Sequence, residues 1–178
     1  MLPIVLIPIG GIRPAVADFL SLSLPEIINS PCRILEENIG IEPFYNIERQ
    51  QYHSTEILRK LLPVAEANRA QVLGLMDKDL YIPILTFVFG EAQLGGRCAL
   101  VSCHRLHQSF YGLPEDETLF LTRCEKEAVH ELGHTMGLTH CANFECVMHY
   151  STSVADVDLK RNVFCPRCSE ILGIRSVW

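Results

Sequence analysis

The 178-residue sequence has little positive charge, because 15 Lys and Arg residues stand against 21 Asp and Glu residues. Its net charge is -6, and no run of basic residues occurs along the chain. Proteins that bind nucleic acids usually present a basic face that neutralises phosphates. We therefore expect no nucleic-acid partner.

Long apolar runs are also missing. No stretch approaches the roughly 18 consecutive apolar residues of a membrane-spanning helix, so we expect no membrane partner. The apolar segment 1–9 is interrupted by prolines and lacks both a basic start and a small-residue cleavage site. We interpret it as a buried strand, not as a secretory signal, and expect a cytoplasmic protein.

The composition is that of an ordinary globular protein, with 48% hydrophobic and 20% charged residues. The length fits one domain, which we expect to be a monomer. Strands and helices alternate in the first half, and this order predicts an α/β (α+β) fold with helices on a mixed, twisted sheet. Strands are predicted at 3–9, 32–36, 44–49, 71–76, 84–89 and 98–103, and helices at 15–28, 55–67 and 123–136.

The predicted helix 123–136 has signals at both ends. Thr122 and Glu125 have the spacing of a capping box, which satisfies free backbone N–H groups at a helix start. Gly137 stands where a left-handed residue would end the helix. The residues with the clearest chemistry lie on this helix and just beyond it.

His130 and His134 are four residues apart, so a helix places both on one face, about 6 Å apart along its axis. Two imidazoles at this spacing can bind one zinc ion. Glu131 can reach a water in an open position of that ion and accept its proton. His-Glu-x-x-His also occurs by chance in proteins that bind no metal.

The longer string His-Glu-x-x-His-x-x-Gly-x-x-His is more specific, because two further positions must match. Gly137 lets the chain leave the helix sharply, and His140 follows three residues later. His140 can then complete a three-histidine site with one open position, which is typical of catalytic zinc.

Four of the eight cysteines have the spacing of a second metal site: Cys141, Cys146, Cys165 and Cys168. Four thiolates would close the coordination shell of zinc, so this site would be structural. Two disulfides and a zinc-ribbon nucleic-acid module are the alternatives. Segment 141–178 has four basic and four acidic side chains, so it carries no net positive charge to attract phosphates. We expect the other cysteines to be small buried residues: Cys32, Cys98, Cys103 and Cys124.

The histidine string, the cysteine directly after it and the cysteine spacing together resemble the archaemetzincins, a family of the metzincin clan of zinc peptidases. The likeness is specific over about residues 130–168 and weaker over 73–81 and 87–92. It implies a compact metzincin-like fold in one domain. The upper lobe, residues 1–137, would hold the sheet and the active-site helix, and the small lower lobe, residues 138–178, would hold the methionine turn and the cysteine site.

The resemblance also implies a peptidase with two zinc ions per chain, one catalytic and one structural, and Glu131 as general base acting on peptide or protein substrates. The alternative is a weakly active or inactive zinc protein that binds peptides. Met148 would form an apolar floor under the imidazoles. The segment Phe87–Phe89 would be a strand along the cleft or an interior strand.

Two more residues have open roles. Tyr150 follows Met148 by two positions, as in astacins and serralysins, where such a tyrosine can join the zinc. It could do so here, stabilise an oxyanion, or be a buried or rim tyrosine whose hydroxyl is hydrogen-bonded. Glu91 is a candidate for the acidic group that would bind a substrate's amino terminus if the enzyme trims chain ends.

Overall fold

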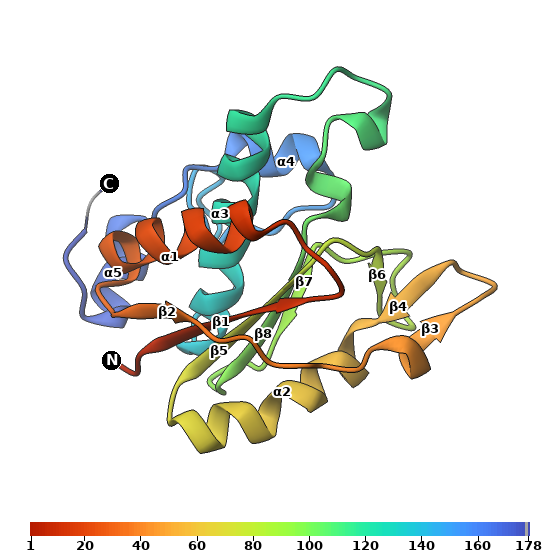
Figure 1. The fold of residues 1–178 in the computed structure, drawn as a ribbon. Coiled ribbons are helices and arrows are strands. Elements are labelled where there is room, and N and C mark those ends of the chain that lie inside the picture. The colour runs from red at the N-terminus through yellow and green to blue at the C-terminus, as the bar shows by residue number, and fades with distance from the viewer. Residues whose placement is uncertain (177) are drawn as a thin grey trace.

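The computed structural model describes residues 1–176 and 178, and its centre is a five-stranded sheet (Figure 1). The strand order is β2-β1-β5-β8-β7. The first four strands are parallel, and β7 runs antiparallel to β8 at one edge. The strands are β1 (Ile4–Ile9), β2 (Cys32–Ile34), β5 (Gln71–Met76), β7 (Gly90–Ala92) and β8 (Cys98–Ser102).

Helices cover both faces of this sheet. Figure 1 shows α1 (Pro14–Ile28) and α3 (Glu117–Thr135) on one face and α2 (Ser54–Asn68) on the other. Each face has its own apolar core, because side chains alternate between the faces of a strand. Two short helices follow α3, namely α4 (Val154–Leu159) and α5 (Pro166–Leu172). Every helix among the described residues is too short or too polar to cross a membrane.

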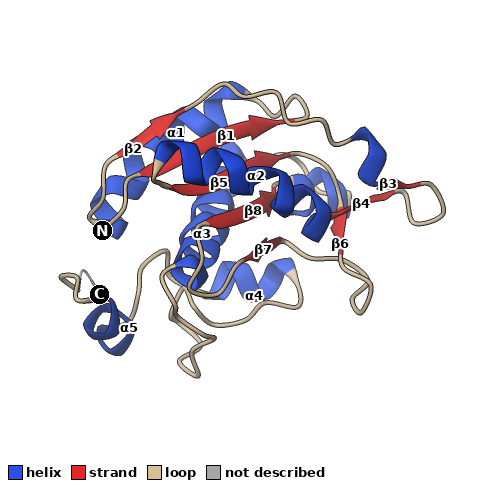
Figure 2. Ribbon diagram, turned by 90° about the horizontal axis from the view of Figure 1, so that it is seen from below, coloured by secondary structure: helices blue, strands red, loops and turns tan. Residues whose placement is uncertain are grey.

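A small second sheet extends from the end of the first, and Figure 2 shows it beyond β7 and β8. Its order is β3-β4-β6, from β3 (Tyr45–Asn46), β4 (Gln51–His53) and β6 (Leu80–Tyr81). Single 3-10 turns occur at Glu42–Phe44, His104–Leu106 and Ser109–Tyr111.

The α/β fold class is confirmed, and β1, α1, α2, β5 and β8 lie within a residue of their predicted bounds. These elements have strong periodic patterns and clear stop signals. The strands at 32–36 and 44–49 are shorter than predicted, since β2 ends at Ile34 and β3 has two residues.

The predicted strand at 84–89 was wrong. Between β6 and β7 the chain turns, and the pairing edge begins at Gly90 instead. The carbonyls of Leu85 and Thr86 accept hydrogen bonds from the side chains of Arg49 and Gln51, not from a neighbouring strand. The backbone at Leu85 and Thr86 is therefore held by side chains distant in sequence. Val88 and Phe89 instead make single backbone hydrogen bonds, to Leu80 and from Ser102.

The predicted start of the long helix was also wrong. α3 begins at Glu117, where the Asp116 carboxylate accepts from the Leu119 N–H at 2.9 Å. The expected capping box does not form, because Thr122 lies inside the helix and donates to the Thr118 carbonyl at 2.8 Å. The end is as expected, since Gly137 has a φ of 93° just after the last turn.

Candidate metal centres

Helix α3 places the first three predicted site residues on the face that lines a cleft. His130 and His134 lie one turn apart, and Glu131 follows His130. All three side chains line a cleft of about 570 Å³. The chain leaves the helix at Gly137, and His140 returns to the same cleft. The structure therefore brings the predicted residues together.

The three histidines could hold one metal ion. One ring nitrogen from each of His130, His134 and His140 lies within 4.8 Å of the others. The Nε2 atoms of His130 and His134 are 3.1 Å apart. Two ligands at ~2.0–2.1 Å from a tetrahedral zinc lie about 3.4 Å apart, so this spacing fits the ion closely.

Hydrogen bonding on the opposite side of each ring supports this assignment. The Nδ1 of His130 lies 2.7 Å from the Val147 carbonyl, and that of His134 lies 2.7 Å from the Leu138 carbonyl. A carbonyl oxygen only accepts, so Nδ1 must carry the proton and Nε2 must be bare. Two bare Nε2 atoms cannot bond to each other, whereas a cation between them satisfies both.

The protonation of the imidazoles also suits a metal. Burial lowers the pKa of His130 well below its usual value, with Lys160 and His134 adding to the effect. Burial likewise lowers the pKa of His134 and of His140. All three rings are therefore neutral at neutral pH, which is the form that binds metals.

The Glu131 carboxyl is buried against the edge strand of the sheet. A Cβ at Gly90 of β7 would meet Glu131 Oε1 at 2.6 Å, so only glycine leaves room for the carboxyl. Burial raises the pKa of Glu131 well above its usual value, and the charges of Glu127 and Glu91 raise it further. The Glu131 carboxyl thus occupies the space that a side chain at position 90 would fill.

Met148 packs directly against Gly133 of α3. A Cβ at Gly133 would overlap the Met148 sulfur and come within 3.1 Å of Phe164. Met148 is fully buried. The glycine between the two helical histidines is thus explained by a close approach of this methionine.

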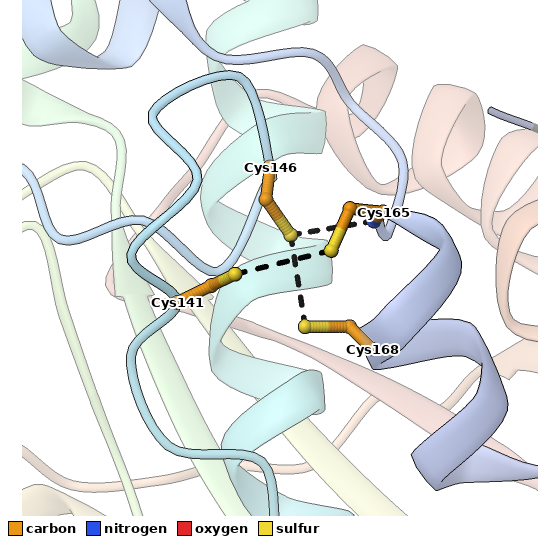
Figure 3. Close-up of side chains that lie close together, drawn as sticks. All are labelled: Cys141, Cys146, Cys165 and Cys168. Atoms are coloured by element: carbon orange, nitrogen blue, oxygen red, sulfur yellow. Dashed lines mark hydrogen bonds between the residues drawn. The ribbon is translucent and has the colours of Figure 1, made fainter.

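The four clustered cysteines form the second centre (Figure 3). Their four sulfurs lie within 4.8 Å of one another. Cys141 and Cys165 are 3.8 Å apart, and so are Cys146 and Cys168. A disulfide would require about 2.05 Å. Four thiolates at about 2.3 Å from a tetrahedral zinc would be about 3.8 Å apart, which the structure matches.

The two centres are joined at one peptide bond, because Cys141 follows His140 directly. The turn 146–149 contacts both centres. Met148 accepts from the Cys141 N–H at 2.9 Å, and the His149 ring donates to the Cys141 carbonyl at 2.9 Å. Val147 of the same turn holds the His130 ring. A shift of this turn would therefore change the positions of ligands in both centres.

The cleft walls come from two distant parts of the chain. One wall is the segment from Ile82 to Leu94, including the edge strand β7, and the other is Tyr150–Thr152. Tyr150 is 54% exposed, and its ring centroid lies 6.0 Å from that of His140. It is a rim residue whose hydroxyl makes no hydrogen bond within the described part of the chain. Glu91 accepts from Ser54 and Thr55 at the start of α2.

Two residues near the centre were missed from the sequence. Glu127 lies one turn before Glu131 and lines the cleft. Its carboxylate pairs with Lys160 at 3.0 Å in the interior. The i, i+4 spacing to Glu131 could have identified Glu127, but no signal in the sequence indicates Lys160.

The chain is similar to known proteins over most of its length. A model of peptidase family M54 matches residues 25–173. An archaemetzincin of Methanocaldococcus jannaschii is 41% identical and covers 96% of this chain and 93% of its own length.

Two crystal structures of archaemetzincins are similar throughout. The one from Archaeoglobus fulgidus, complexed with malonate, has a TM-score of 0.83 at 40% identity and covers 96% of this chain and 99% of that chain. The one from Methanopyrus kandleri has a TM-score of 0.85 at 36% identity, with coverage of 97% and 93%.

Proposed function

Because the chain belongs to peptidase family M54, the archaemetzincins, which are zinc metallopeptidases, we propose that it hydrolyses peptide bonds with Glu131 as general base. The observation that carries this proposal is the convergence of His130, His134 and His140 beside a buried carboxylate in an open cleft. An entirely structural site would need a fourth protein ligand and no cleft.

The three histidines would hold zinc through Nε2, with the bonds at Nδ1 fixing two of the rings. When bound, zinc supplies a Lewis acid that makes water more acidic and polarises the peptide carbonyl. Glu131 would take the proton of the attacking water and pass it to the leaving amine. Gly90 leaves the room in which the Glu131 carboxylate makes both transfers.

The edge strand β7 would bind the substrate backbone. In the described structure it pairs with β8 on one side, and Gly90, Glu91 and Ala92 line the cleft. An extended peptide can add to such an edge by main-chain hydrogen bonds. The resemblance had implied this role for Phe87–Phe89, which also line the cleft, and we assign it to residues 90–92.

The cysteine site would hold a second, structural zinc through Cys141, Cys146, Cys165 and Cys168. Its closed set of four thiolates leaves no position for water. We further propose that residues 1–137 form an upper lobe and residues 138–178 a lower lobe, with the cleft between them. The lower lobe has little core of its own, and in such segments a structural metal stabilises the fold most.

The competing function is peptide binding without cleavage. An intact carboxylate at Glu131 disfavours it, since a binding protein does not need a base there. The zinc-loaded protein and its Glu131→Gln variant would be incubated with a broad peptide mixture, and products read by mass spectrometry. We expect cleavage by the parent only. Equal cleavage by both would remove Glu131 as the base, and cleavage by neither would favour the binding function.

A further inference from the structure

A lysine ammonium lies in the interior near the histidine centre. The Lys160 side chain is 0% exposed, and its Nζ donates to Glu127 Oε1 at 3.0 Å. Glu127 is also buried, at 4% exposure of its side chain. Moving both charges out of water costs several kcal/mol per ion, and hydrophobic residues of similar size often serve stability as well or better. A contribution to stability alone therefore does not explain why a buried ion pair, and not two hydrophobic residues, occupies this place.

Lys160 makes a second contact, with the backbone of the turn that follows the histidine string. Its Nζ donates to the His149 carbonyl at 3.3 Å. His149 directly follows Met148, and its own N–H donates to Cys146 at 2.9 Å. One ammonium thus joins helix α3 to the turn 146–149, whose Val147 carbonyl is bonded to the His130 ring.

This junction lies close to the groups that orient the metal ligands. Glu127 lies three residues before His130 on α3, and Val147 in the joined turn accepts the Nδ1 bond of His130. The His149 ring holds the carbonyl of Cys141, next to His140. If the turn moved away from α3, the orientations of His130 and His140 would change together.

The contact also occupies the Glu127 carboxylate. Carboxylates are good zinc ligands, and Glu127 lines the same cleft as the histidines. With Oε1 bound to the ammonium, Glu127 stays outside the group of ligand atoms that converge within 4.8 Å. Lys160 thereby helps to keep the histidine centre open for water and substrate.

We propose that Lys160 is a positioning residue for the histidine centre: paired with Glu127, it holds the turn 146–149 against α3 and so fixes the imidazoles of His130 and His140. The inference rests on the proposed function, because it assumes that these histidines bind zinc. Lys160 touches neither the metal site nor the cleft. It acts through the backbone of His149 and through the charge of Glu127.

The test uses the full chain in which Lys160 is replaced by methionine, alone and together with Glu127→Gln. The single variant leaves a buried carboxylate without its partner and can fail to fold. The double variant removes both charges, so it should fold and keep two zinc ions per chain. In the double variant we expect kcat to fall by about tenfold or more, which is the loss typical when a residue that orients metal ligands is replaced. We expect KM to change by about twofold at most.

Two further readouts report on the metal centre without any substrate. We expect the double variant to lose zinc from the histidine site to a chelator about tenfold faster than the parent. We also expect an altered visible absorption of Co²⁺ bound at the histidine site. These two measurements remain decisive even if no peptide is cleaved by the parent, so failure of the proposed function and failure of this inference are distinguishable.

A second ion pair made by α3 provides a matched control. Arg123 of α3 makes a two-bond ion pair with Asp158 of α4, both bonds at 2.7 Å, and it does not touch the turn 146–149. The variant Arg123→Met with Asp158→Asn removes the same charges, and we expect unchanged kcat and Co²⁺ absorption. A folded Lys160 double variant with parental kcat, zinc loss and Co²⁺ absorption would overturn the proposal.

Discussion

Gly133 and Met148 are in such close contact that no side chain fits between them. A Cβ at position 133 would overlap the methionine sulfur and lie 3.1 Å from its Cε. Gly133 lies between the two helical histidines, so the packing of one methionine constrains the helix that carries the metal site. The consequences of this contact can be measured.

Replacing Gly133 with alanine should displace Met148 and the turn that holds it. Overpacking a dense core costs typically about 1–3 kcal/mol, and we expect that loss in the free energy of unfolding of the zinc-loaded protein. Zinc should also leave the histidine site faster. The matched control is Gly40→Ala, where the added Cβ meets its nearest atom at an ordinary 3.7 Å. Equal stability of the two variants would contradict the close contact.

Replacing Gly90 with alanine should move the Glu131 carboxyl, since the new Cβ would lie 2.6 Å from its Oε1. A misplacement of about 1 Å can cost about 100-fold in rate, so we expect a large loss of kcat. Zinc content should remain that of the parent, because no histidine is touched. Steady-state kinetics and metal analysis test this together. A variant that keeps full activity would show that Glu131 does not need this position.

Removing the second centre should weaken the first. In the variant Cys165→Ser with Cys168→Ser, we expect one zinc to be lost outright and the histidine site to bind zinc more weakly. The reason is that Cys141 directly follows His140, and Cys146 directly precedes Val147, whose carbonyl accepts from the His130 ring. Control substitutions are Cys32→Ser and Cys98→Ser, which lie outside both centres. Unchanged zinc affinity at the histidines would show that the two centres are independent.

Cys32 gives a prediction for pH. Burial raises the pKa of its thiol to about 11. Only the thiolate reacts with alkylating reagents, so the rate at Cys32 should rise about tenfold per pH unit and level off only near pH 11. Peptide mapping after timed alkylation of the native protein measures this rate. A plateau near pH 9 would mean that the thiol is not held in an apolar site.

The sequence predicted the chemistry of the site better than its surroundings. The positions of His130, Glu131 and His134 follow from helical periodicity, and Gly137 marks the helix end in sequence and in structure. These are local signals. The cysteine spacing likewise pointed to one cluster, but only the 3.8 Å separations of the sulfurs distinguish a metal site from disulfides.

The surroundings depend on contacts between residues far apart in the chain. Segment 84–89 has the apolar pattern of a strand, yet its Leu85 and Thr86 carbonyls accept from the side chains of Arg49 and Gln51, more than 30 positions earlier. Lys160 reaches Glu127 across 33 positions. Neither contact produces a periodic pattern or a characteristic spacing in the sequence. The cleft wall and the buried ion pair could therefore be identified only from the folded structure.

The most direct test of the account is the number of zinc ions per chain in the purified, metal-loaded protein, measured by elemental analysis against protein concentration. The account predicts two, one held by His130, His134 and His140 and one by the four cysteines. The variant with all three histidines replaced by alanine should keep one. A parent protein that binds a single zinc, or a variant that still binds two, would contradict the assignment of two separate centres.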